Sequence, residues 1–130
     1  MTTEHLDPYV DKAAALVTLL AERADTVRQL GRLTDDVVDQ LGAAGLITLM
    51  APRSRGGAQA NPETFVRVLE ELARGCGSTS WVCGVYAATL YMVASFPDEA
   101  QEEVFTDPAP KSVAAFQPEG AATPVDGGYR

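Results

Sequence analysis

The sequence is poor in the residues from which metal sites, disulfide frameworks and many nucleophilic active sites are built. Its 130 residues contain two cysteines and one histidine. Cys76 and Cys83 are too few for a disulfide framework and form no CxxC motif, so a reducing compartment fits the chain. Neither has a histidine or carboxylate motif beside it, and His5 precedes the first predicted helix. We therefore expect two buried thiols, a solvated terminal histidine, no metal site and no catalytic residue.

Positive charge is also scarce. The chain has 10 Lys and Arg residues against 18 Asp and Glu residues, a formal net charge of −8. This imbalance argues against nucleic acid and against an anionic membrane as partners. The first residues contain no basic stretch followed by an apolar one, so we expect no signal peptide and a cytoplasmic protein. Apolar residues still make up 46% of the chain, which predicts a folded domain.

No apolar run is long enough to predict a membrane span. The longest, Trp81 to Phe96, would reach about 24 Å as a helix, whereas the hydrocarbon core of a bilayer is about 30 Å thick. Since no charged residue lies between Arg74 and Asp98, we expect a central helix that is apolar on every side. The other helices of so short a chain would cover only part of it. Its remaining face predicts contact with another domain or with an apolar ligand.

Capping residues and first-turn prolines predict the other helices. Three helices are expected to begin after the caps Asp7, Thr34 and Asn61 and to end at Gly31, Gly45 and Gly75. Ser78 or Thr79 is expected to cap the apolar helix, and a short fifth helix is expected after Pro97. Residues 46–50 form a short apolar run that we expect to be buried and extended.

The end of the chain changes in character. Residues 112–116 look strand-like, and Asp126-Gly127 is a hairpin turn signal. A lone hairpin is marginally stable at best. We therefore expect an all-α fold, with a helical domain over residues 1–110 and the first strands of an incomplete β domain over residues 111–130.

The start of the apolar helix holds the best candidate for a binding site. Small hydroxyl residues at 78–80 precede Trp81, and Ala88, Thr89 and Met92 follow at helical spacing. One interpretation is that all of these residues pack in the core. The other is that they form a pocket wall against a planar aromatic ligand, with Trp81 as the platform. A weaker signal is Arg53 and Arg55 beside two glycines, a pattern that can cradle phosphate.

Five segments, taken in order, resemble the N-terminal region of the acyl-CoA dehydrogenase superfamily. They are residues 41–47, 51–57, 68–82, 96–105 and 122–130. Ser80-Trp81-Val82 and residues 123–130 are more similar to the flavin-dependent, two-component monooxygenase branch than to the dehydrogenases. The resemblance implies an α-helical domain followed by a middle β domain and a C-terminal helical bundle, usually in a homotetramer.

The resemblance also implies cofactors and partners. Reduced flavin, FADH2 or FMNH2, would come from a separate flavin reductase, and O2 would serve as co-substrate for the oxygenation of an aromatic or polycyclic compound. By position, the flavin-binding residues would be Trp81, Ala115, Phe116, Gln117, Pro118 and Gly120. The substrate-binding residues would be Tyr86, Thr89 and Leu90. Phenol hydroxylases of this branch often have a histidine at the position of Thr89, and a threonine there is able only to hydrogen-bond a substrate.

Two alternatives stay open at this point. One is an acyl-CoA dehydrogenase, with permanently bound FAD and an acyl thioester substrate. The other is a non-catalytic helical module that docks a partner through residues 81–96. Since most flavin contacts of the family lie in its middle and C-terminal domains, we expect the 130 residues alone to be inactive.

Overall fold

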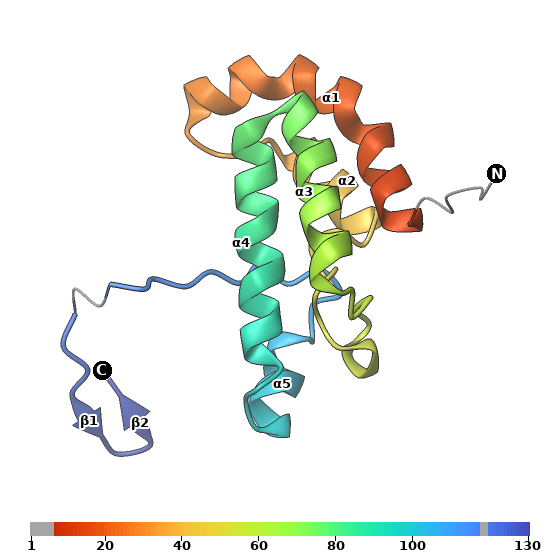
Figure 1. Ribbon diagram of the computed structural model, residues 1–130. Coiled ribbons are helices and arrows are strands. Elements are labelled where there is room, and N and C mark those ends of the chain that lie inside the picture. Colours follow the sequence, from red (N-terminus) through yellow and green to blue (C-terminus); the bar gives the residue numbers. More distant parts are fainter. Residues whose placement is uncertain (1–6, 118–119) are drawn as a thin grey trace.

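The computed structural model describes residues 7–117 and 120–130, and the described part is mostly helical. Its elements are α1 (Pro8–Leu30), α2 (Asp35–Ala43), the short 3-10 helix η1 (Arg53–Arg55), α3 (Pro62–Gly75), α4 (Gly77–Val93), α5 (Asp98–Val104), β1 (Pro124–Val125) and β2 (Gly128–Tyr129). In Figure 1, α3 and α4 stand side by side, α1 crosses one end of this pair, and the hairpin lies apart from the helices. The all-α class predicted from the sequence is confirmed.

Local capping explains why α1 and α3 begin where the sequence predicts. The Asp7 carboxylate accepts a hydrogen bond from the Tyr9 amide at 3.0 Å, and Asn61 accepts one from the Thr64 amide at 2.8 Å. The Thr64 hydroxyl also donates to Asp7 at 2.6 Å, which ties the starts of the two helices together. At the other end of α1, Gly31 adopts a φ of 65°, the left-handed conformation that glycine favours.

The core lies where α1, α2, α3 and α4 meet the chain between α2 and η1. Leu20, Leu41, Leu46, Leu72 and Leu90 are among its fully buried side chains. The run at residues 46–50 is largely buried, as expected, but it forms turns, so the prediction of an extended segment is wrong. The Leu46 amide donates to the Leu41 carbonyl, and further turn bonds follow it. An apolar run this short predicts burial but does not determine backbone conformation.

The start of α4 differs from the prediction. The helix begins at Gly77 with the extended residue Cys76 as its cap, and not at Ser78 or Thr79. Cys76 also ends α3, so a single residue makes the connection between the two helices. The Ser80 hydroxyl donates to the Leu69 carbonyl of α3 at 2.7 Å, which holds the first turn of α4 against its neighbour. This tertiary contact overrides the local capping signal.

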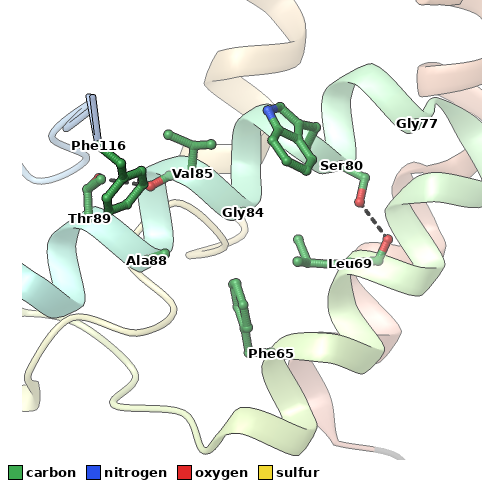
Figure 2. Close-up of a pocket in the computed structure, with 10 residues that line it drawn as sticks. Phe65, Leu69, Gly77, Ser80, Gly84, Val85, Ala88, Thr89 and Phe116 are labelled. Carbon is green, nitrogen blue, oxygen red and sulfur yellow. Dashed lines mark hydrogen bonds between the residues drawn. The ribbon is translucent and has the colours of Figure 1, made fainter. Parts of the chain in front are cut away.

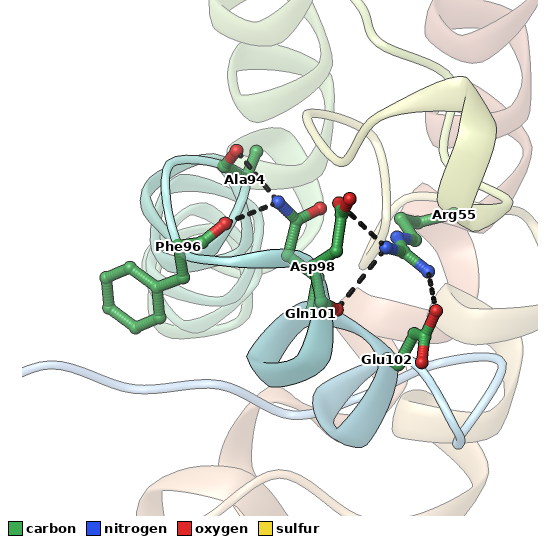
Figure 3. A network of polar contacts seen from close by, with 6 residues as sticks. All are labelled: Arg55, Ala94, Phe96, Asp98, Gln101 and Glu102. Atoms are coloured by element: carbon green, nitrogen blue, oxygen red, sulfur yellow. Dashed lines mark hydrogen bonds and ion pairs between the residues drawn. The ribbon is translucent and has the colours of Figure 1, made fainter.

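A polar network fixes α5 to the end of α4 and to η1 (Figure 3). The Gln101 side-chain amide donates to the carbonyls of Ala94 at 3.2 Å and Phe96 at 2.7 Å. These bonds satisfy backbone carbonyls that follow the end of α4. The Arg55 guanidinium lies 3.2 Å from the Asp98 carboxylate and 3.8 Å from that of Glu102. Arg55 therefore forms ion pairs with carboxylates of its own chain. This argues against a phosphate-binding site at residues 53–57.

In the C-terminal residues, the structure matches the predicted hairpin turn but not the strand predicted before it. β1 and β2 pair antiparallel, with Val125 opposite Gly128, and Gly127 has a φ of 83° in the turn. Residues 112–116 lie in no strand, so that expectation is wrong, because a strand needs a pairing partner and none is present among the described residues. The domain division at residue 110 stays a prediction. In the described residues no helix is both long and apolar enough to cross a membrane.

Candidate aromatic-binding pocket

A cavity of about 350 Å³ lies between α3 and α4 (Figure 2). Its lining comes from three parts of the chain: α3, one face of α4, and the extended segment that follows α5. The lining residues are Phe65, Leu69, Gly77, Ser80, Trp81, Gly84, Val85, Ala88, Thr89 and Phe116. Figure 2 shows Phe65 reaching toward the cavity from α3, and Phe116 lying next to Thr89. Aromatic side chains from segments far apart in the sequence therefore meet at the rim of an open cavity.

Small residues on α4 create the space. Gly84 and Ala88 lie one turn apart, so a strip of the helix facing the cavity has almost no side chain. A Cβ atom at Gly84 would lie 3.1 Å from the Leu69 Cδ1 atom, closer than ordinary van der Waals contact. Glycine at this position therefore allows close packing of α3 on α4 and leaves the hollow beside it open.

Two large aromatic side chains at the cavity are exposed. Trp81 is 75% exposed and Phe116 is 83% exposed. Such exposure of adjacent large apolar groups is typical of surfaces that contact a ligand or another protein. The exposed apolar surface of α4 predicted from the sequence is confirmed. Tyr91 of α4 and Phe96, which follows the helix, are exposed as well.

The two hydroxyl groups of the lining are already hydrogen-bonded. Ser80 donates to the Leu69 carbonyl, and the Thr89 hydroxyl lies within 2.6 Å of the Ser112 carbonyl. Among the lining residues that the structure describes, none has an ionisable side chain. The cavity therefore suits an uncharged planar ring, because a charged group would lose its hydration without gaining a partner.

The structure brings together only some of the residues proposed for binding. Trp81, Thr89 and Phe116 line the cavity. Ala115, Gln117 and Gly120 line a shallower, open hollow that shares Phe116 and includes Arg130. Tyr86 lines a different pocket together with Arg32 and Lys111, and Leu90 is fully buried in the core. Pro118 lies outside the described residues.

Sequence analysis missed the wall of the cavity that α3 supplies. Phe65 and Leu69 fit the apolar pattern of a helix, but only the packing of α3 on α4 shows that they line a cavity. Gly84 was the one available signal, since a glycine inside an apolar helix often marks a close approach. Met92, expected on the same stripe as Trp81, is exposed beyond the lining residues.

The cysteines behave as the sequence predicts. Both are free and buried, and burial raises the pKa of the Cys83 thiol to about 12. The Cys83 thiol lies 3.7 Å from the Leu46 carbonyl, to which it donates. It is therefore protonated at neutral pH and is not a nucleophile. No cluster of three or more metal-ligating side chains exists in the described residues, and His5 lies outside them.

Comparison with known proteins identifies the class to which this helical domain belongs. The family model of the acyl-CoA dehydrogenase N-terminal domain matches residues 3–109. The chain belongs to this family, and the resemblance read from its sequence is confirmed.

Two relatives of the chain are named as oxygenase subunits or components. The oxygenase subunit HsaA of Mycobacterium tuberculosis (strain ATCC 25618 / H37Rv), a flavin-dependent monooxygenase, is 39% identical over 120 residues, which cover 89% of this chain and 30% of that protein. The oxygenase component of an FADH(2)-dependent resorcinol hydroxylase from Rhizobium sp. (strain MTP-10005) is 30% identical over 122 residues, covering 93% of this chain and 30% of that protein.

A solved structure shows the same fold. The crystal structure of 3-HSA hydroxylase from Rhodococcus sp. RHA1 superposes with a TM-score of 0.88 at 34% identity, covering 95% of this chain and 32% of that one. The chain thus spans about a third of the length of the proteins that it matches.

The lining of the cavity fits part of a flavin or an aromatic substrate. An uncharged hollow beside two exposed aromatic side chains accommodates a planar ring, against which an indole or phenyl group stacks. The described lining of the cavity offers no cation for a phosphate group, and in the adjoining hollow the described lining includes Arg130. The described lining therefore fits the ring of a flavin or an aromatic substrate and not the phosphate groups of a flavin.

Proposed function

We propose that this chain is the helical N-terminal domain of the oxygenase component of a flavin-dependent monooxygenase. The protein would use reduced flavin and O2 to oxygenate an aromatic or polycyclic substrate. The observation that carries the proposal is the uncharged cavity between α3 and α4 beside the exposed indole of Trp81. It occurs in a chain whose relatives are named as oxygenase subunits or components.

The cofactor and partners are part of the same proposal. FADH2 is favoured over FMNH2 by the name of the resorcinol hydroxylase. The word "component" in that name supports a separate flavin reductase as a partner. The homotetramer rests on the resemblance to the family alone, and the cytoplasmic location rests on the absence of a signal-peptide pattern in the first residues.

The residues of this chain would bind and shield the reacting rings. Bound reduced flavin would supply the electrons that activate O2. Trp81 and Phe116 would contact the planar rings, with Ala115, Gln117, Pro118 and Gly120 along the flavin. The apolar lining from α3 and α4 would exclude water from the ring face, which protects reactive oxygen chemistry from hydrolysis and proton leakage.

Fluorescence of Trp81 tests this proposal, because it is the only tryptophan of the chain. The chain is titrated with reduced FAD and reduced FMN under anaerobic conditions. Saturable quenching is expected, because the ring would stack on or beside the indole.

The variant Ala88→Leu is expected to weaken this binding at least tenfold. Ala88 is exposed and lines the cavity, so leucine fills the space without disturbing the core, and leucine is a good helix former. Ala14→Leu, at an exposed position of α1 outside the cavity lining, is the matched control and should bind like the parent. Equal affinity of both variants would contradict a site at this cavity. In the complete protein, retention of oxidised FAD through purification and its reduction by an acyl-CoA would favour the dehydrogenase alternative.

A further inference from the structure

Thr89 is a buried residue of α4 whose hydroxyl reaches outside its own helix. The residue is 4% exposed. Its Oγ1 atom lies 2.6 Å from the Ser112 carbonyl oxygen, and 2.8 and 3.1 Å from those of Val85 and Tyr86. A threonine hydroxyl has one proton and donates one strong hydrogen bond at a time. The carbonyls of Val85 and Tyr86 already accept amide protons within α4, so Ser112 is the favoured acceptor.

The Thr89–Ser112 hydrogen bond holds a segment that has few other attachments. Residues 111–117 belong to no helix or strand, and Val113 is 72% exposed. Within the described part of the chain, this is the one hydrogen bond between that segment and the helices. Figure 1 shows the segment crossing α4 before it leads to the hairpin. The hydroxyl therefore fixes the point at which the segment crosses the helix.

Phe116 depends on this fixed point. It follows Ser112 by four residues, which span at most about 14 Å of extended chain. Its ring lies next to Thr89 at the edge of the cavity (Figure 2). Because Phe116 is 83% exposed, packing against the helices does little to hold it. The nearest firm attachment is the backbone at Ser112.

We propose that Thr89 is a positioning residue, whose hydroxyl fastens the backbone at Ser112 to α4 and thereby holds Phe116 as a wall of the cavity. Its importance for oxygenation rests on the proposed function, whereas the anchoring does not. The role differs from hydrogen bonding to a substrate, because the Thr89 proton is already donated to Ser112.

Limited trypsin digestion measures the anchoring directly. Lys111 is an exposed trypsin site next to Ser112, and Arg53 in η1 provides an internal reference. Thr89→Val keeps the shape of the side chain and removes the donor, so cleavage after Lys111 should become about fivefold faster relative to cleavage after Arg53, as expected for the loss of one hydrogen bond. Thr89→Ser keeps a hydroxyl and should restore the parent rate. Thr79 is a buried threonine of the same helix whose hydroxyl has no partner among the described residues, so Thr79→Val should leave the rate unchanged.

Two aromatic probes then separate positioning from direct contact. Quenching of Trp81 is measured with naphthalene and with 1-naphthol, which differ by one hydroxyl group. If Thr89 acts through Phe116, Thr89→Val weakens both probes by the same factor of three or more. Phe116→Ala should have a similar effect, and the double variant should lose no more than Phe116→Ala alone, because coupled residues are not additive.

Each outcome decides between the two roles. Selective loss of 1-naphthol, or additive losses in the double variant, would overturn the positioning role in favour of direct hydrogen bonding. Unchanged cleavage after Lys111 in Thr89→Val would overturn the anchoring. If neither probe quenches Trp81 in the parent chain, ring binding at the cavity fails, and the cleavage rates still decide whether Thr89 anchors the segment.

Discussion

At the scale of single residues, two neighbouring hydroxyls of α4 have opposite surroundings. Ser80 donates to the Leu69 carbonyl at 2.7 Å, whereas the buried Thr79 hydroxyl has no hydrogen-bond partner in the part of the chain that the structure describes. Both residues are buried, and they follow one another in the sequence. Their contributions to stability should therefore differ in sign, because a buried polar group is unfavourable unless it is hydrogen-bonded.

Paired substitutions test this difference. Thr79→Val should leave the free energy of unfolding unchanged or raise it by up to about 1 kcal/mol, since valine replaces an unsatisfied hydroxyl with a methyl group. Ser80→Ala should lower it by about 1–2 kcal/mol, since the Leu69 carbonyl loses its side-chain donor. Urea unfolding followed by circular dichroism measures both. A larger loss in Thr79→Val than in Ser80→Ala would contradict these assignments.

At the scale of elements, the contact between α1 and α3 depends on a glycine. A Cβ atom at Gly75 would lie 2.6 Å from the Val17 carbonyl oxygen and 2.7 Å from the Leu20 Cβ atom. These are atoms of the α1 backbone and its nearest side-chain carbon, which cannot move away without shifting the helix. The end of α3 therefore packs on α1 only with glycine at this position.

Gly75→Ala should lower the free energy of unfolding by about 2 kcal/mol or more, the cost of overpacking a tight interface. Gly77→Ala is the matched control, because a Cβ atom there has open space within 4 Å and the residue lies inside a helix. It should be neutral or slightly stabilising, since alanine favours helix over glycine. The two midpoints of thermal unfolding check this, and equal midpoints would contradict the close approach of α1 and α3.

Elements defined by local chemistry were predictable from the sequence, and those defined by tertiary contacts were not. Asp7 and Asn61 cap their helices through bonds to amides two or three residues away, so their roles are visible in the sequence. The start of α4 depends on the contact between Ser80 and Leu69, and a strand at residues 112–116 would need a partner. The candidate site divides in the same way. Trp81 and Thr89 share one helix face, whereas the wall at Phe65 comes from another helix.

At the scale of the whole molecule, the chain is a helical domain that leaves several large apolar side chains exposed. Trp81, Tyr91, Phe96 and Phe116 are all more than half exposed. In the proposed function, these side chains contact flavin, substrate and further parts of a longer oxygenase. The relatives are about three times as long as this chain, which supports that interpretation.

The most direct test of the central claim maps reduced flavin onto the folded chain by nuclear magnetic resonance. Trp81 is the only tryptophan, so its indole N–H gives a single identifiable signal. With reduced FAD added anaerobically, we predict saturable shifts of this signal and of the amides of Gly84 and Ala88, and their loss in Ala88→Leu. An unchanged indole signal, or shifts confined to residues away from α3 and α4, would contradict the claim that this cavity binds the flavin ring.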